Sequence, residues 1–205
     1  MGLETQKNAS AQQPGGNRED AILRSAFEAF TRYGFRRTSM EDIAKGAKIS
    51  RPALYLHFRN KEAIFRAMAE AYFARATRAL ERALLDKGSA VEVLHRAFVA
   101  KDGGILHAIV ASPHSAELLD AHASISADIV EDGERRMASL FANWIARGVS
   151  EGRLNTTGIS GTPAEIAGTL MSALKGLKSV PTTVDTYQAA QRRLAELFGR
   201  ALARD

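Results

Sequence analysis

Cationic and hydrogen-bonding side chains are concentrated in one short stretch of the sequence, residues 38–62 (TSMEDIAKGAKISRPALYLHFRNKE). Arg51 carries a planar guanidinium, which can donate two parallel hydrogen bonds to the O6 and N7 acceptors of guanine or to a phosphate. Lys61 adds a positive charge at the start of an expected helix, where the helix dipole also favours an anion. These side chains are suited to a phosphate-rich partner such as a nucleic acid.

Capping residues predict where helices begin within this stretch. Thr38 and Glu41 have the spacing of a capping box, and Ser39 and Asp42 repeat that spacing one position later. A helix is therefore expected to start near Ser39. Its buried side is predicted from apolar residues spaced three and four apart: Met40, Ile43, Ala44 and Ala47.

A second short helix is predicted after a tight turn. Ser50 is a suitable N-cap, and Pro52 falls in the first turn, where its missing N–H costs little. Leu54 and Phe58 are four residues apart and are expected to face inward, and Asn60 caps a third helix. Two short helices joined in this way form a helix-turn-helix, whose second helix reads DNA. An ordinary helical hairpin is the alternative, and the spacing alone does not separate the two.

The residue types separate these alternatives better than the spacing does. The stretch resembles the DNA-binding domain of the TetR family of transcriptional regulators at these positions: Ile43, Ala44, Ala47, Ile49, Ser50, Leu54, Tyr55, His57, Phe58, Asn60, Lys61, Glu62 and Phe65. Lys48 stands where that family usually has a glycine in the turn, so it is expected to need a positive φ, at a cost of about 1 kcal/mol. Pro52 replaces another frequent glycine, on the face that would meet the groove.

The resemblance implies a set of DNA-contacting residues. Tyr55 and His57 look like phosphate-positioning residues, and Lys61 resembles the phosphate-contacting lysine of the family. A place in the small core is the alternative for Tyr55. Thr38 and Ser39 cap the preceding helix and are candidates for phosphate contact as well. The full set expected at DNA is Thr38, Ser39, Lys48, Ser50, Arg51, Pro52, Ala53, Tyr55, His57 and Lys61.

Positive charge is localised in the same part of the chain. The whole sequence has a formal net charge of +5. Residues 18–66 contain 11 basic and 6 acidic side chains, a difference that equals the whole net charge, while 1–17 and 67–205 each balance to zero. A localised basic domain attracts polyanions. A solvated basic surface that binds nothing is the alternative, and the coincidence with the predicted helix-turn-helix argues against it.

Composition excludes several other classes of protein. With 205 residues, 45% of them hydrophobic, the chain can bury the core of one large or two small domains. It has no cysteine, so disulfides and thiolate metal sites are excluded, which suits a reducing cytoplasm. No apolar run is long enough for a transmembrane helix, and residues 1–17 lack the apolar region of a signal peptide. We predict a mobile tail over 1–17 and a cytoplasmic protein.

Catalytic and metal-binding patterns are absent from the sequence. There is no nucleophile elbow, no phosphate-binding glycine loop, no zinc-protease motif and no cysteine nucleophile, so we expect no enzyme and no cofactor. His107, His114 and His122 raise the question of a metal site. Pro113 interrupts any common helix, and no two of these histidines are four residues apart, so no metal is predicted.

The remaining sequence predicts helices only. The expected fold is all-α and TetR-like, with about nine helices: a three-helix head over 18–65 that carries the helix-turn-helix, and a helical bundle over 66–205. The first helix is expected to be capped by Asn17 and ended by Gly34. The helix that starts at Lys61 continues to about Gly88 and would belong to both parts. Further helices are expected over 90–101, 105–111, 117–123, 125–149, 163–177 and 185–203.

In its second part the chain also resembles the TetR family, through Trp144 to Leu154 and the two apolar helices that follow. This implies a homodimer through the last two helices (about 163–178 and 185–203) and an effector pocket in the 66–205 part. Candidate effector-binding residues are Phe98, His107, Met137, Phe141 and Trp144, with a plain hydrophobic core as the alternative for most of them. The implied function is a ligand-responsive regulator, with repression favoured, that binds a palindromic operator and leaves it when a small molecule binds. A helical enzyme or carrier with a vestigial head, or a protein that coats DNA without sequence preference, are the other hypotheses.

Overall fold

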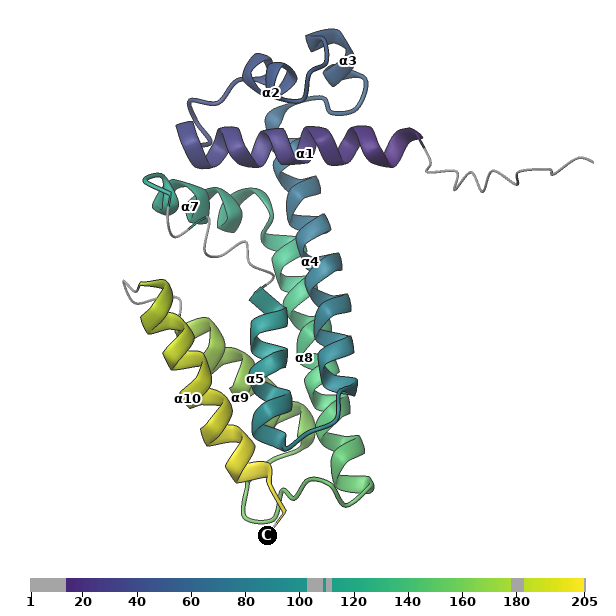
Figure 1. Cartoon of the computed structure of the whole chain (residues 1–205), viewed down its shortest axis with the longest axis vertical. Helices are drawn as coiled ribbons and strands as arrows, with labels where there is room; N and C mark the ends of the chain where they lie inside the picture. The colour runs from purple at the N-terminus through teal and green to yellow at the C-terminus, as the bar shows by residue number, and fades with distance from the viewer. Residues whose placement is uncertain (1–13, 103–108, 110–111, 178–182, 205) are drawn as a thin grey trace, which may run out of the picture.

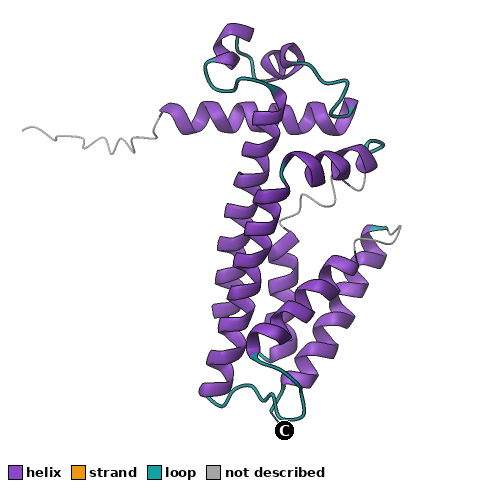
Figure 2. Ribbon diagram, turned by 180° about the vertical axis from the view of Figure 1, so that it is seen from behind, coloured by secondary structure: helices purple, strands orange, loops and turns teal. Residues whose placement is uncertain are grey.

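The computed structural model describes residues 14–102, 109, 112–177 and 183–204. Within these residues the chain forms nine helices and no strand beyond an isolated bridge between Leu154 and Ala203, so the all-α prediction is confirmed (Figure 1, Figure 2). The helices are α1 (Pro14–Tyr33), α2 (Met40–Gly46), α3 (Arg51–Tyr55), α4 (Lys61–Leu85), α5 (Ala90–Asp102), α7 (Ser115–Ile125), α8 (Ala127–Ser150), α9 (Pro163–Gly176) and α10 (Val184–Leu202). None of these helices is long and apolar enough to cross a membrane.

The molecule has a small end made of α1, α2 and α3, called the head here, and a long end made of α5 to α10, called the body. Helix α4 begins in the head and runs to the far end of the body, beside α5 and α8 (Figure 1). Helix α1 lies across the top of α4, with α2 and α3 on its outer side and α7 on its inner side (Figure 1, Figure 2). Helices α9 and α10 cover the other side of the body.

The head and the body each have a separate cluster of buried apolar side chains. In the head, the rings of Phe30, Phe35 and Phe65 lie with their centroids 5.2 to 5.7 Å apart, an arrangement that favours tilted and edge-on ring contacts. Leu118 and Ala121 of α7 complete the same cluster. A body helix therefore forms part of the core of the head. The predicted division into a head over 18–65 and a body over 66–205 did not include this contact.

Capping was predicted correctly for α3 and α4, but not for α1, which begins before Asn17, nor for Thr38. Ser50 and Asn60 cap α3 and α4 as expected, through side-chain oxygens that accept a backbone N–H. Of the two overlapping capping boxes, the pair that forms is Ser39 with Asp42, so the Thr38 box is wrong. Thr38 is only 2% exposed, and its hydroxyl proton is shared between Gly34 O (2.7 Å) and Ala29 O (3.2 Å), which holds the side chain against the end of α1 instead of the start of α2.

Two helix boundaries differ clearly from the predictions, and one predicted helix is not tested. Helix α1 begins at Pro14 rather than after Asn17, in keeping with the preference of proline for the first helical position. Ile125 ends α7 instead of starting the long helix, because Ser126 has a non-helical backbone (φ −124°, ψ 19°). The predicted helix over 105–111 lies, except for one residue, outside the described part of the chain.

Candidate nucleic-acid interface

Helix α3 is held on the surface by a single buried side chain. Leu54 is 0% exposed and fixes the inner side of the helix, while Arg51, Pro52 and Tyr55 are exposed on the outer side. Ser50 Oγ accepts a hydrogen bond from Ala53 N (3.3 Å) and fixes the start of the helix. The structure therefore presents the predicted reading face to solvent, at the outer end of the head (Figure 1).

Arg51 is held in place by Tyr55. Its guanidinium carbon lies 5.6 Å from the centre of the Tyr55 ring, and Arg51 Nη2 lies 3.5 Å from the Tyr55 hydroxyl. Tyr55 is 43% exposed, which argues against its place in the core. Stacking on the ring reduces the freedom of the arginine side chain, so less entropy is lost when the guanidinium binds a base edge or a phosphate.

The turn before α3 has the unusual backbone that the sequence predicted. Lys48 has φ 57° and is the one described non-glycine residue with a positive φ. Lys48 N donates to Lys45 O (3.1 Å) and Ile49 N donates to Ala44 O (3.0 Å), so these two carbonyl oxygens near the end of α2 are satisfied. The lysine side chain is exposed at this turn, directly ahead of α3.

Two residues after α3 extend the outer surface. His57 is half-buried, and its Nδ1 lies 3.9 Å from a Glu19 carboxylate oxygen of α1. Leu56 is 87% exposed, the highest value among the large exposed apolar residues of the described chain. Sequence reasoning missed Leu56, although a helix that turns Leu54 and Phe58 inward must turn the residue between them outward.

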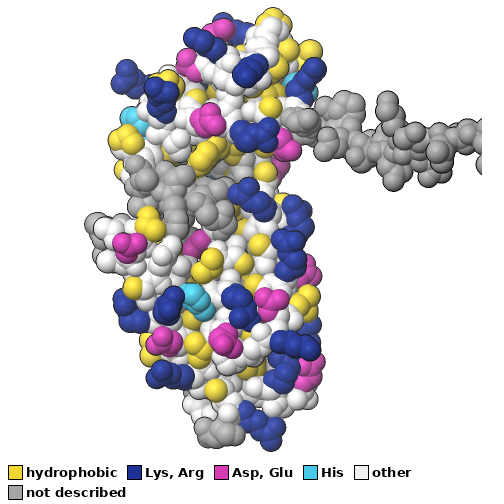
Figure 3. All heavy atoms as spheres, viewed as in Figure 1, with side chains coloured by type: hydrophobic (Ala, Val, Ile, Leu, Met, Phe, Trp, Pro, Cys, Tyr) yellow, Lys and Arg dark blue, Asp and Glu magenta, His cyan; other side chains and the backbone are white. Residues whose placement is uncertain are grey.

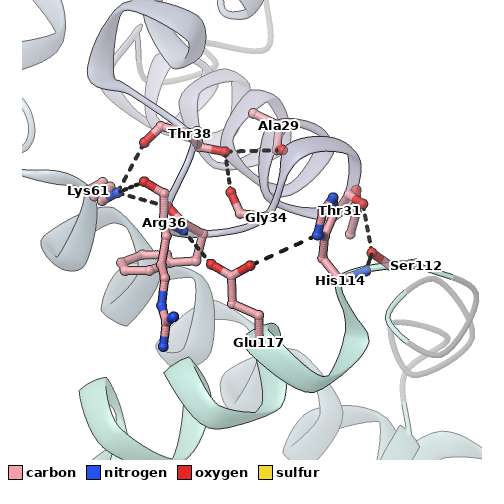
Figure 4. A network of polar contacts seen from close by, with 10 residues as sticks. Ala29, Thr31, Gly34, Arg36, Thr38, Lys61, Ser112, His114 and Glu117 are labelled. Carbon is pink, nitrogen blue, oxygen red and sulfur yellow. Dashed lines mark hydrogen bonds and ion pairs between the residues drawn. The ribbon is translucent and has the colours of Figure 1, made fainter.

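Lys61 is the first residue of α4, and its ammonium group binds backbone carbonyl oxygens. Its Nζ donates to the carbonyl oxygens of Phe35 (2.8 Å), Arg36 (2.9 Å) and Thr38 (3.1 Å), and it also lies 4.8 Å from the centre of the Phe35 ring (Figure 4). A lysine ammonium has three N–H donors, and all three are used here. This geometry favours a role for Lys61 in holding the connection between α1 and α2, in place of a phosphate contact.

Ser39, the residue directly ahead of α2, forms its hydrogen bonds within the protein. Ser39 is exposed, but its backbone N–H and hydroxyl both bond to Asp42 Oδ2, at 2.9 and 2.6 Å. These hydrogen bonds hold the pKa of Asp42 below its usual value. A carboxylate thus occupies the N-terminus of α2, where a phosphate would otherwise be favoured.

Positive side chains are frequent on the visible face of the head. Figure 3 shows Lys and Arg side chains around the upper end of the molecule with a few Asp and Glu among them, and side chains of both charges on the body. This distribution agrees with the net charge of residues 18–66 and the balanced remainder. Among the described residues no group of His, Cys, Asp or Glu could hold a metal ion.

The expected effector-binding residues lie in the filled core of the body. Phe98, Met137 and Phe141 are 0% exposed, and Trp144 is 2% exposed. They pack in one cluster with residues of α4, α5, α8 and α9, and this favours the alternative of a plain hydrophobic core. His107 lies outside the described residues.

A groove with a volume of about 720 Å³ lies between α4 and α8. Phe73 and Ile129 give it an apolar floor, and a methyl group added at Gly133 would overlap the Phe73 ring, so the two helices meet closely there. Arg66, Arg78, Arg136, Glu70, Asp128 and Asp132 line its sides. The groove combines an apolar surface with charges of both signs.

Comparisons with known proteins agree with this arrangement. A sequence profile described as "Bacterial regulatory proteins, tetR family" matches residues 22–68, the segment that contains α2, α3 and the start of α4. Over these residues the chain matches the TetR family of regulatory proteins. The match of these residues to a family of regulatory proteins supports the expectation that the chain is not an enzyme.

The curated relatives match only part of the chain. The transcriptional regulator EthR of Mycolicibacterium smegmatis is 37% identical over 75 residues, which cover 37% of this chain and 35% of that protein. The transcriptional repressor ComR of Escherichia coli is 34% identical over 73 residues, which cover 36% of this chain and 35% of that protein. The chain thus matches about a third of the length of these two relatives.

Solved structures resemble the whole TetR-like fold. SmeT, the repressor of a Stenotrophomonas maltophilia multidrug efflux pump, superimposes with a TM-score of 0.66 at 20% identity, over 91% of each chain. A structure of SmeT in complex with triclosan gives a TM-score of 0.65 at 18% identity, over 92% of this chain and 93% of that one. At these identities the likeness supports the fold alone.

Proposed function

We propose that this chain is a DNA-binding transcriptional regulator that reads DNA with α3. The observation that carries the proposal is the exposed face of α3, where Arg51 is stacked on Tyr55 at the surface of the basic head. The head has the size and arrangement of helix-turn-helix modules, in which the second helix enters the major groove. Such a regulator would act in the cytoplasm.

We further propose that it acts as a repressor on a palindromic operator, as a homodimer. A two-fold dimer brings two α3 helices to successive major grooves about one DNA turn apart, or a multiple of that distance. The TetR-type head and the roles of ComR and SmeT as repressors support this direction of regulation.

Helices α9 and α10 are the proposed dimer surface. Small residues face solvent on α9 at intervals of four, Gly168, Ser172 and Gly176, and a methyl group added at either glycine would meet nothing within 4 Å. Leu197 of α10 is 68% exposed. Small residues permit the close approach of a partner helix, and an exposed leucine gains from being covered. Gly168→Glu should shift the protein towards monomer in analytical ultracentrifugation, while Ser139→Glu on α8 should not; equal dimerisation of both variants would contradict this surface.

We also propose a small-molecule effector that binds in the groove between α4 and α8. Its volume lies within the range of small-molecule sites, and its apolar floor with charged sides suits a compound with an apolar body and polar ends. Ala74→Trp would fill the groove from the exposed side of α4. A compound found by screening to release the wild type from DNA should fail to release this variant. Equal release of both proteins would mean that the effector binds elsewhere.

The decisive experiment for DNA binding is selection of sites from random duplex DNA. The wild type should enrich an inverted repeat, and Arg51→Ala should bind that repeat at least about tenfold more weakly, because a bidentate arginine contributes about 1–3 kcal/mol of discrimination. Arg147→Ala, exposed on α8, is the matched control for loss of one positive charge. Recovery of random sequences by the wild type would refute sequence-specific regulation and favour nonspecific coating of DNA.

A further inference from the structure

Helix α7 connects the body to the head through hydrogen bonds that do not involve α4. Glu117 Oε1 accepts a hydrogen bond of 2.6 Å from the backbone N–H of Arg36, in the connection between α1 and α2 (Figure 4). Just before α7, Ser112 Oγ donates to Thr31 O of α1 (2.7 Å). A methyl group added at Gly34 would collide with the Glu117 carboxylate, so the connection packs directly against α7.

The Arg36 backbone is consequently held on both sides. Its N–H donates to Glu117 of α7, and its C=O accepts from Lys61 Nζ of α4 at 2.9 Å (Figure 4). The other Glu117 oxygen lies 3.9 Å from His114 Nδ1, which limits the rotation of the carboxylate. A hydrogen bond to a carboxylate is stronger than one between neutral groups, and this one is short.

The opposite end of α7 is anchored as well. Arg66 Nη1 of α4 donates to the carbonyl oxygen of Ile125, the last residue of α7, at 2.7 Å. The same guanidinium makes two parallel hydrogen bonds of 2.7 Å to Asp128 at the start of α8. Helix α7 is thus fixed to α4 at one end and to the α1–α2 connection at the other.

We propose that Glu117 is a positioning residue for DNA recognition: it makes α7 a strut that sets the angle of the helix-turn-helix relative to the body. This rests on the proposed function as a DNA-binding regulator. A head attached through α4 alone can tilt about the start of that helix, whereas a second attachment through α7 fixes the tilt. In a two-fold dimer the tilt determines the distance between the two α3 helices, and therefore the preferred spacing of the half-sites.

The contact itself is tested without DNA, by amide hydrogen exchange of the full-length protein. Glu117→Ala removes the acceptor, so the Arg36 amide should exchange at least about tenfold faster than in the wild type. Glu117→Gln keeps a side-chain oxygen at this position and should restore most of the protection. Asp120→Ala, exposed on the same helix, removes the same charge and should leave the Arg36 amide unchanged. Unchanged exchange in Glu117→Ala would overturn the contact.

The positioning role is tested with the selected inverted repeat and with repeats whose half-sites are moved apart or together by one and two base pairs. Glu117→Ala should bind the selected repeat about tenfold more weakly and should lose most of the wild type's preference for that spacing. Its affinity for random duplex and its melting temperature should match those of Asp120→Ala. Glu117→Gln should keep the preference, since an amide oxygen still accepts the Arg36 N–H.

The outcomes separate this proposal from the function on which it rests. Spacing preference in Glu117→Ala equal to that in Asp120→Ala, with faster exchange at Arg36, would overturn the positioning role and leave the DNA-binding function intact. Loss of affinity for selected and random DNA alike would assign Glu117 a merely structural role and overturn the proposal too. A wild type that selects no sequence would refute the proposed function, and the exchange experiment would still decide whether the strut exists.

Discussion

Lys61→Met offers a sharp test of how the head is built. Lys61 Nζ donates to three backbone carbonyl oxygens, at 2.8, 2.9 and 3.1 Å, and its stem lies over the Phe35 ring. Methionine keeps an apolar stem of similar length and removes all three donors. The variant therefore isolates the contribution of the ammonium group.

The loss is expected to be moderate. A hydrogen bond from a charged donor contributes roughly 1.5–3 kcal/mol net, but three bonds on one half-exposed ammonium are not additive, so about 3 kcal/mol is a reasonable total. For a chain of this size each kcal/mol lowers the melting temperature by about 2–4 °C, which gives a decrease of about 6–12 °C. Thermal and urea unfolding followed by circular dichroism would measure it. Lys87 is exposed and lies two residues beyond the end of α4. Lys87→Met is therefore the matched control and should unfold like the wild type.

DNA binding distinguishes the carbonyl contacts from a phosphate contact. Each phosphate contact contributes about 0.9 to the slope of log affinity against log salt, so a dimer that lost two would have a slope shallower by about 1.8. Because the Lys61 donors are all bonded to carbonyls, we expect Lys61→Met to lower operator affinity through distortion of the head, with the salt slope kept within about 0.5 of the wild type. A slope shallower by about 1.8, with an unchanged melting temperature, would refute this reasoning and restore the phosphate contact.

Three further outcomes are expected. Gly133→Ala should lower the free energy of unfolding by about 1–3 kcal/mol in urea titrations, because the added methyl overlaps Phe73; a wild-type midpoint would contradict that overlap. Ser39→Ala should cost about 1 kcal/mol and Glu41→Ala very little, since the Ser39 capping box is the one that forms; the reverse order would argue for the Thr38 box. Hydrogen bonding to an arginine lowers the pKa of Asp128 to about 2, so its carboxylate stabilises the fold above the unfolded-state pKa and this contribution is lost as the pH falls towards 2. Asp128→Asn should therefore unfold with a weaker dependence on pH between about 4 and 2, and an unchanged dependence would contradict the assignment.

The head was predictable because its signals are local. An N-cap and the helix it starts lie within a few residues, so Ser50 and Asn60 could be identified from the sequence and both form their caps. The positive φ of Lys48 could also be predicted, since the family pattern has a glycine at that position. Overlapping signals were harder. Thr38 and Ser39 fit the same capping motif. Ser39 forms the cap because Thr38 is buried against α1, and the local sequence does not indicate that burial.

The contacts of the body were less predictable because they depend on packing between distant segments. An apolar stripe indicates that Phe98, Phe141 and Trp144 are buried, but it does not indicate whether a cavity lies beside them. The groove between α4 and α8 arises from the angle and distance of two helices more than 40 residues apart in the chain. The hydrogen bond from the Arg36 N–H to Glu117 joins residues 81 positions apart, and the types of the two residues do not predict that they meet.

The groove and the strut are joined by shared residues, and this suggests a route for regulation. Arg66 and Asp128 line the groove, and Arg66 also holds the end of α7 through Ile125 O. A ligand with an acidic end would compete with Asp128 for the arginine and would thereby release that end of α7. The other end of α7 holds the Arg36 N–H through Glu117, so the tilt of the head would change with α4 intact.

Such a ligand shifts the equilibrium between the two tilts of the head only by its difference in affinity for them. An acidic ligand found to bind the groove should therefore bind more weakly when the operator is present, by the same factor by which it weakens operator binding. Equal ligand affinity with and without operator would exclude this route, whatever the ligand does elsewhere.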